Sequence, residues 1–247
     1  VVFDYGNNIR PQAAAAGLTE ALEIDIFTER YLRPLFCRGI GPFRWVCVSG
    51  EVGDRDLIDD LCLELFAGEE RVTTWIELAR EHVPLQGLPA RIGWLGHGER
   101  SRLALAVNDA VADGRLAGPV AFTRDHMDAG AMTHPFIITE RMRDGSDSIA
   151  DWPVLDALLL TASMADLVVM HAGGGGYAGY SLSAGVTVVA DGTPGAAVRL
   201  RRALDVDTGL GVLRHADAGY EEARAEAERA GLGLGNDEAG DYPEEGA

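Results

Sequence analysis

The stretch Gln86-Gly87-Leu88-Pro89-Ala90-Arg91-Ile92-Gly93-Trp94-Leu95-Gly96-His97-Gly98-Glu99-Arg100 decides how the middle of the chain folds. Pro89 precedes a short run at residues 90–95 that predicts a buried strand, and residues 101–112 predict a helix. Gly96 and Gly98 lie between the two elements. Such glycines serve either a turn that needs a positive φ or a close approach of the backbone to a ligand, and the local pattern favours neither.

Strands and helices are predicted to alternate along the rest of the chain. Alternation of this kind is typical of an α/β architecture, so we expect a mixed or parallel sheet flanked by helices. The chain has 247 residues, and a hydrophobic content of 47% is ample for a packed core. The predicted strands are 120–122, 168–171 and 186–190, and the predicted helices are 11–21, 54–66, 73–81, 152–165, 196–203 and 221–230, of which 152–165 is apolar enough to be buried.

Composition and charge exclude several classes of protein. The formal net charge is −18, which repels phosphate backbones and argues against nucleic-acid binding. No apolar run approaches the roughly 20 residues that span a bilayer, so we expect a cytoplasmic protein without membrane contact. Cys37, Cys47 and Cys62 lack the spacing of a zinc site or a disulfide framework, and we expect each to be a small buried side chain.

Two arginines, Arg38 and Arg44, lie among the glycines and aromatic residues of segment 36–45. A pair of guanidinium groups in such a setting can bind a carboxylate through parallel hydrogen bonds. Arginines in exposed loops are more often solvated, and the local sequence slightly favours that interpretation.

Asp125, His126 and Asp128 directly follow the predicted strand 120–122. Carboxylates beside a histidine at the end of a strand suit acid and base catalysis, because ligands of open α/β sheets gather at strand ends. The alternative is a capped turn that carries surface charges.

A run of glycines at residues 173–176 follows the predicted strand 168–171. In Gly174, Gly175 and Gly176 the backbone N–H groups can approach a phosphate or a cofactor closely. The run lacks the G-x-G-x-x-G order of a dinucleotide fingerprint, so its spacing alone is a weak signal.

Several short and uncommon sequence motifs occur along nearly the whole chain. In chain order they are Phe3-Asp4-Tyr5-Gly6-Asn7-Asn8, Arg33 to Trp45, Gln86 to Arg91, Arg124-Asp125-His126, Met142-Arg143-Asp144-Gly145-Ser146-Asp147, Asp151-Trp152-Pro153, Ala190-Asp191-Gly192-Thr193 and Arg214-His215-Ala216-Asp217-Ala218-Gly219-Tyr220. Together they resemble the urocanase (urocanate hydratase) family. Members of that family are longer, so the resemblance implies that this chain corresponds to their C-terminal portion.

The resemblance implies an activity, a cofactor and a set of site residues. The family adds water to urocanate, giving imidazolonepropionate, and uses tightly bound NAD+ as an electrophile; its members form homodimers. By resemblance, Arg44 with Arg38 would hold the substrate carboxylate, and Asp128 or Asp125, beside His126, would be the general acid and base. The backbone of Gly175, within the run Gly174 to Gly176, would contact NAD+.

The resemblance also implies a domain organisation and leaves two functions open. Residues 1–35 would end the preceding nucleotide-binding region, 36–235 would form the catalytic region, and 236–247 an acidic flexible tail. Gly93 stands where the family has a cysteine that is important for activity. One hypothesis is a urocanate hydratase that manages without this thiol; the other is a degenerate relative that binds NAD+, an imidazole-type ligand or a partner subunit without turnover. An ordinary NAD-dependent oxidoreductase is disfavoured, because no complete dinucleotide fingerprint is present.

Overall fold

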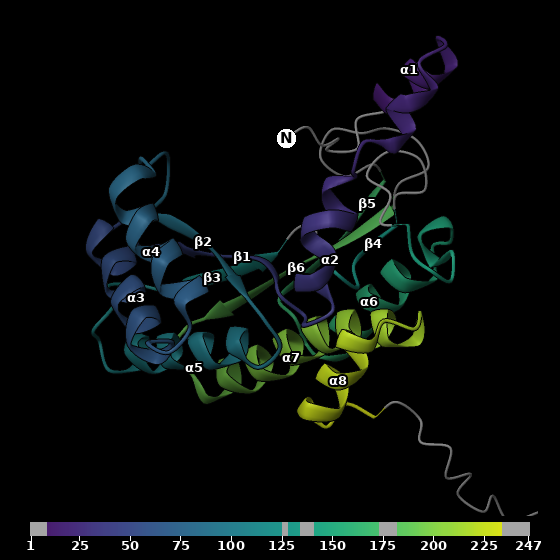
Figure 1. Ribbon diagram of the computed structural model, residues 1–247. Coiled ribbons are helices and arrows are strands. Elements are labelled where there is room, and N and C mark those ends of the chain that lie inside the picture. The colour runs from purple at the N-terminus through teal and green to yellow at the C-terminus, as the bar shows by residue number, and fades with distance from the viewer. Residues whose placement is uncertain (1–8, 125–127, 134–140, 173–181, 234–247) are drawn as a thin grey trace, which may run out of the picture.

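A computed structural model describes residues 9–124, 128–133, 141–172 and 182–233, and it confirms an α/β fold in which helices flank one sheet (Figure 1). The strands are β1 (Gly41–Cys47), β2 (Ala90–Leu95), β3 (Val120–Arg124), β4 (Met132–Thr133), β5 (Leu167–Ala172) and β6 (Leu182–Ala190). The helices are α1 (Ile9–Ala15), α2 (Arg33–Phe36), α3 (Val52–Leu65), α4 (Glu70–His82), α5 (Glu99–Ala112), α6 (Asp151–Ala162), α7 (Pro194–Asp217) and α8 (Glu221–Ala230), with short turns η1 (Thr19–Glu23), η2 (Thr28–Leu32) and η3 (Ser146–Ser148).

The direction of the strands corrects the expectation of a mixed or parallel sheet. The strand order is β2-β1-β3-β6, and every strand pair within the described residues is antiparallel. Leu182 and Ser183 of β6 pair with both β4 and β5, so these two strands lie on opposite edges of β6.

The connections explain how an alternating sequence produces antiparallel pairs. Helices α3 and α4 have 14 and 13 residues and form a hairpin, which carries the chain out from β1 and back to an antiparallel β2. Helix α5 then carries the chain from β2 to β3, which lies beyond β1 and runs parallel to β2 without pairing with it. Strands β2 and β3, which a single helix joins, are therefore parallel to each other, as the alternating pattern predicts. They do not pair, because the antiparallel strand β1 lies between them.

One face of the sheet packs against the helices, and the burial of β1 shows which. Phe43, Trp45 and Cys47 are buried, while Arg44 and Val46, which point the opposite way, are half-buried. This alternation is typical of an antiparallel sheet with one covered face. Figure 1 shows α5 and α7 running along the covered side. The main core between the sheet and the helices includes Phe43, Trp45, Ile58, Cys62, Ile76, Leu95, Leu103, Val107, Phe122, Val186, Val188, Leu200 and Leu204.

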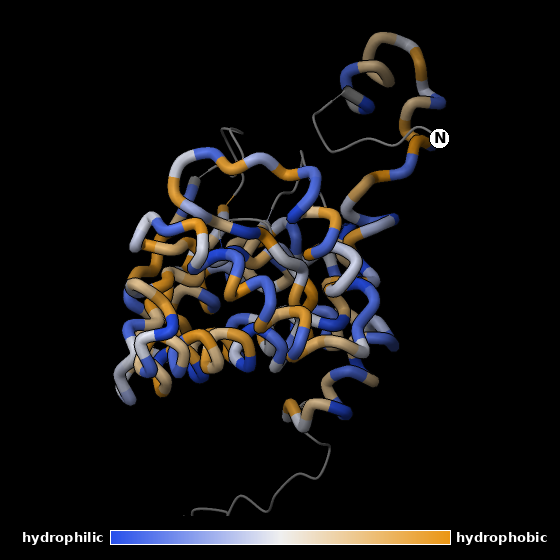
Figure 2. Tube along the Cα trace, turned by 90° about the vertical axis from the view of Figure 1, so that its left-hand side faces the viewer, coloured by the Kyte–Doolittle hydropathy of each residue, from blue (hydrophilic) through white to orange (hydrophobic). Residues whose placement is uncertain are grey.

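Three helices differ from the sequence prediction. Helix α7 runs unbroken through Gly209 and Gly211. A Cβ at position 211 would press against Ala129, so this glycine permits close packing and does not end the helix. Helix α6 is only partly buried and exposes Leu158. Helix α1 is shorter than predicted and stands apart from the body in both Figure 1 and Figure 2.

Figure 2 shows hydrophilic and hydrophobic segments alternating along the body of the chain, as amphipathic elements of a single layered core require. No helix among the described residues is long and apolar enough to span a membrane.

Candidate functional site

The stretch from Gln86 to Arg100 forms the predicted strand, a turn and the start of the predicted helix. The structure explains why glycine occupies positions 96 and 98. Gly98 has a φ of +76°, in the left-handed region that favours glycine. A Cβ on Gly96 would lie 2.9 Å from Cγ1 of Ile40, so close packing excludes a side chain there. A positive φ therefore accounts for Gly98, and close packing against Ile40 accounts for Gly96.

Gly93 faces the covered side of the sheet. A Cβ at this position would lie 3.1 Å from both Cη2 and Cζ3 of Trp45, a fully buried side chain. Any side chain at position 93 therefore points into the core, away from Arg44 on the opposite face.

We expect Gly93→Cys to lower the free energy of unfolding by about 1–3 kcal/mol, because it overpacks the Trp45 ring. We also expect the new thiol to stay unreactive towards a disulfide reagent in the native protein, because it points into the core. The three native cysteines, Cys37, Cys47 and Cys62, are buried and should contribute little background labelling. Gly93→Ala adds the Cβ without the sulfur and is the matched control. Rapid labelling of the native Cys variant, or a gain in turnover absent from the Ala variant, would contradict this placement.

Arg44 lies on the face of the sheet opposite α3, α5 and α7, which we call the open face. Its side chain is half-buried, and its strand register places it beside Ile92 on β2 and Thr123 on β3. Thr123 in turn pairs with Thr187 on β6. Because facing residues of neighbouring strands carry their side chains on the same side, these four side chains form a row across the open face.

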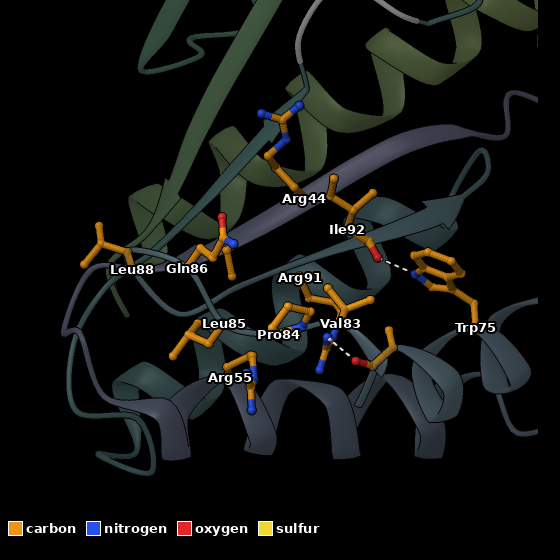
Figure 3. Close-up of a pocket in the computed structure, with 12 residues that line it drawn as sticks. Arg44, Arg55, Trp75, Val83, Pro84, Leu85, Gln86, Leu88, Arg91 and Ile92 are labelled. Carbon is orange, nitrogen blue, oxygen red and sulfur yellow. Dashed lines mark hydrogen bonds between the residues drawn. The ribbon is translucent and has the colours of Figure 1, made fainter. Parts of the chain in front are cut away.

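A cavity of about 610 Å³ adjoins Arg44 (Figure 3). This volume is within the ordinary range for small-molecule sites. Figure 3 shows the Arg44 guanidinium group at the upper rim, pointing away from Trp75 and Val83. The lining is mainly apolar and consists of Arg44, Arg55, Trp75, Ala79, Val83, Pro84, Leu85, Gln86, Leu88, Ala90, Arg91 and Ile92.

Two other arginines of this cavity already have carboxylate partners. Arg91 is buried and donates from Nε to Asp59 at 3.2 Å and from Nη1 to the Ala79 carbonyl at 3.0 Å. Arg55 donates from Nη2 to Asp56 Oδ1 at 2.6 Å. These ion pairs neutralise the charges of Arg55 and Arg91.

Arg38 lines a different cavity, of about 560 Å³, which it shares with His97, Arg102 and Arg229. Nδ1 of His97 lies 2.9 Å from Oγ1 of Thr208, and burial lowers the pKa of His97. The structure therefore does not bring Arg38 and Arg44 into one cavity.

Asp128 belongs to a buried ionic cluster, by which we mean Arg100, Arg124, Asp128, Asp156 and Asp207. Its Oδ2 lies 2.7 Å from Nη1 of Arg100 and 3.3 Å from Nε of Arg124. Asp207 bridges the same two arginines, 2.8 Å from Nη1 of Arg100 and in contact with Arg124 through both oxygens. Arg124 also donates to Asp156 at 2.9 Å.

Close backbone contacts fix Asp128 as well. Oδ1 of Asp128 accepts from the backbone N–H of Ala129 at 2.9 Å. A Cβ on Gly41, at the start of β1, would overlap this oxygen and lie 2.9 Å from Nη2 of Arg100. Only glycine at position 41 therefore leaves room for the carboxylate.

The cluster has three carboxylates and two guanidinium groups. Asp156 contacts only one of these arginines, Arg124, whereas Asp128 and Asp207 each contact both. Oδ1 of Asp156 has no hydrogen-bond partner within the part of the chain that the structure describes. Burial raises the pKa of Asp156 to about 7, against the attraction of Arg124. A protonated Asp156 leaves two charges of each sign in the cluster.

We expect Asp156→Asn to become more stabilising as the pH rises. The folded chain keeps the Asp156 proton up to a pKa of about 7, whereas an unfolded aspartate loses it near pH 3.9. The stability that this proton contributes is therefore complete below pH 4 and is lost as the pH rises towards 7, at up to roughly 1.4 kcal/mol per pH unit. Asparagine has no such loss.

The measurement compares unfolding free energies of both proteins between pH 5 and pH 8. Asp109→Asn, at an exposed position on α5, is the control and should follow the original chain at every pH. Parallel curves for Asp156→Asn and the original chain would show that Asp156 is ionised throughout.

Asp125, His126 and the run Gly174 to Gly176 lie outside the described residues. The strands that precede these segments in the sequence, β3 and β5, are described. Residues 125 and 173 follow the ends of β3 and β5, and both ends lie beside the N-terminal half of β6. Arg124 and Ala172, the last residues of β3 and β5, therefore lie at the same end of the sheet, and Asp128 lies near Arg124 at this end.

Sequence reasoning missed Arg100, Asp156 and Asp207. Asp156 could have been recognised, because a lone carboxylate within the apolar segment 152–162 predicts a buried partner of opposite charge. Arg100 and Asp207 lie on helices α5 and α7 and are brought together only by the tertiary structure.

The cysteines confirm the prediction of small buried side chains. All three are buried and form no disulfide bond, and desolvation raises the pKa of Cys47 and of Cys62 to about 12. Neither supplies a thiolate at neutral pH. The described residues contain no group of three side chains arranged to hold a metal ion.

Two comparisons with known proteins match this chain. Residues 34–229 match the urocanase C-terminal domain. The chain is also 54% identical over 234 residues to the S-methyl thiourocanate hydratase of Variovorax sp. (strain JCM 16519 / RA8), an alignment that covers 95% of this chain and 42% of that protein. The chain thus spans less than half the length of this relative.

Proposed function

The chain belongs to the urocanase family through its C-terminal domain, and on this basis we propose that it is part of a hydratase that adds water to an imidazole acrylate. The observation that carries the proposal is the 54% identity to a hydratase over 95% of the chain. The location of Arg44 beside a largely apolar cavity supports it, because a flat heterocycle with a carboxylate needs both features.

Two substrates fit this proposal. The sequence motifs quoted above favour urocanate, and the name of the relative favours S-methyl thiourocanate. We infer that S-methyl thiourocanate is the better substrate, because a methylated sulfur adds apolar surface that side chains such as Trp75, Leu88 and Ile92 can cover. Urocanate hydratase activity in histidine degradation is the second candidate.

Within the proposed reaction, Arg44 binds the substrate carboxylate, and Asp128 or Asp125, beside His126, moves the proton. The contacts of Asp128 with Arg100 and Arg124 are consistent with a carboxylate held in one orientation. Arg38 lines the second cavity, so the carboxylate clamp of the proposal consists of Arg44 without Arg38.

We propose NAD+ as the cofactor of the whole protein, on family membership alone. When bound, it would supply an electrophile for the imidazole ring. In the described sheet no two parallel strands pair directly, as they do in the dinucleotide-binding type, and the run Gly174 to Gly176 lies outside the described residues. Mass spectrometry of small molecules released from the denatured full-length protein tests the proposal.

We also propose that the whole protein forms a homodimer. Exposed apolar side chains of α6, Val154, Leu155 and Leu158, support association, because a chain with a net charge of −18 associates most readily through an uncharged face. Sedimentation equilibrium of the full-length protein measures the subunit number.

The deciding experiment follows the absorbance of urocanate and of S-methyl thiourocanate with the full-length protein. Turnover of either substrate supports a hydratase, and the ratio of the two kcat/KM values identifies the preferred one. Asp125→Asn and Asp128→Asn, assayed alongside, separate the two candidate proton carriers. Bound NAD+ without turnover of either substrate would instead support a degenerate relative.

A further inference from the structure

Two hydroxyl side chains lie beside Arg44 on the open face. Thr123 on β3 is the cross-strand partner of Arg44, and Thr187 on β6 is the cross-strand partner of Thr123. All three side chains are half-buried, and the Cβ atoms of such facing pairs lie about 4.5–5.5 Å apart. Arg44, Thr123 and Thr187 therefore extend from consecutive positions across one face of the sheet.

The two hydroxyls share one hydrogen bond. Oγ1 of Thr187 lies 3.3 Å from Oγ1 of Thr123 and donates to it. A pair of hydroxyls has two protons, so one O–H remains after this bond, whichever oxygen donates. Within the described residues, that remaining proton has no acceptor. The pair thus presents a hydrogen-bond donor next to a permanent positive charge.

We propose that Thr123 and Thr187 complete a carboxylate-binding site with Arg44, in which Arg44 supplies the charge and the threonine pair donates the remaining hydroxyl proton to the ligand. The inference rests on the proposed function for the identity of the ligand, a carboxylate on a short chain attached to an imidazole ring. A hydrogen bond to a charged group contributes more than one between neutral groups, and donation by Thr187 polarises the Thr123 hydroxyl further.

The test measures binding without turnover in the full-length protein. Imidazolepropionate lacks the double bond of the substrate and cannot be hydrated, and its carboxamide has the same shape without the charge. We expect Thr123→Val to weaken binding of the acid by roughly 10-fold or more and to leave binding of the amide within about 2-fold. Thr187→Val should have a smaller effect of the same kind.

Three controls separate this role from a structural one. Thr123→Ser keeps the hydroxyl and should restore binding of the acid. Thr161→Val removes a hydroxyl on α6 that donates to the Ala157 carbonyl and should change neither ligand's affinity. Melting temperatures of the valine variants should stay close to that of the original chain, because valine and threonine have the same shape.

The inference is overturned if the original protein does not bind the acid, if Thr123→Val binds it normally, or if this variant loses the acid and the amide equally. Failure of the proposed function gives a different result. In that case neither urocanate nor S-methyl thiourocanate is turned over, while binding of the acid still depends on Arg44 and Thr123.

Discussion

Arg124→Met is expected to lower the free energy of unfolding by about 3–5 kcal/mol at pH 7. The Arg124 side chain is fully buried and contacts three aspartates, Asp128, Asp156 and Asp207. Methionine fills much of the same volume but leaves these carboxylates with Arg100 as the remaining cation of the cluster. Two or three negative charges would then repel one another in a medium that screens them poorly.

Urea unfolding followed by tryptophan fluorescence measures this loss. Arg115→Met is the matched control, because Arg115 is exposed and lies 3.9 Å from Asp113, and it should change stability by less than about 0.5 kcal/mol. The penalty for Arg124→Met should shrink at pH 5, where Asp156 is protonated in either protein. A loss below 1 kcal/mol at pH 7 would mean that the carboxylates of the cluster are already neutral.

Arg44→Gln is expected to lower kcat/KM by on the order of 100-fold or more, since it removes a charged partner of a ligand carboxylate. Arg44→Lys should recover part of the loss, because lysine keeps the charge but not the planar pair of donors. The measurement is initial-rate kinetics of the full-length protein with the better of the two proposed substrates.

Arg55→Gln is the control for this second prediction. Arg55 lines the same cavity, but its charge is satisfied by Asp56. Its replacement should therefore change kcat/KM by only a few-fold. Equal losses in both variants would show that the general positive potential of the cavity matters and that Arg44 has no special role.

Short-range patterns predicted individual elements well. The strand at 90–95 and the helix at 221–230 were predicted with the bounds that the structure has. Both begin and end at clear local signals, a proline or a glycine, so their limits are set by neighbours in sequence. Only residues 196–203 of helix α7 were predicted as a helix, whereas the structure extends it from Pro194 to Asp217. The packing of Ala129 against Gly211 explains why a glycine lies within it.

Strand direction could not be predicted from the same patterns. An alternating order of strands and helices is compatible with parallel neighbours or with the interleaved arrangement found here, in which β1 separates β2 from β3. The choice depends on the α3–α4 hairpin returning the chain beside β1, which is a long-range event. The alternating burial of Phe43, Trp45 and Cys47 indicates a sheet with one covered face, but it is known only from the structure, and the sequence analysis predicted no strand there.

The grouping of the candidate site residues could not be predicted from the sequence, and the role of Arg44 stays a prediction. Arg44 does lie beside a cavity, and Asp128 does lie at the end of the sheet where residues 125–127 begin. Arg38 and Arg44 are six positions apart in sequence, yet they line separate cavities because the chain turns into β1 between them. The roles assigned to Asp128, Asp125, His126 and Gly174 to Gly176 stay predictions.

The contact between Gly41 and Asp128 means that two positions far apart in the sequence constrain each other during evolution. Any side chain at position 41 would occupy the space that the Asp128 carboxylate fills, and it would also press on Arg100. A lineage that loses the glycine must therefore lose or shorten the aspartate, and then the arginine pair has one carboxylate fewer to bind. Among related sequences, positions 41 and 128 should covary, and chains with a larger residue at 41 should have rebuilt the whole cluster.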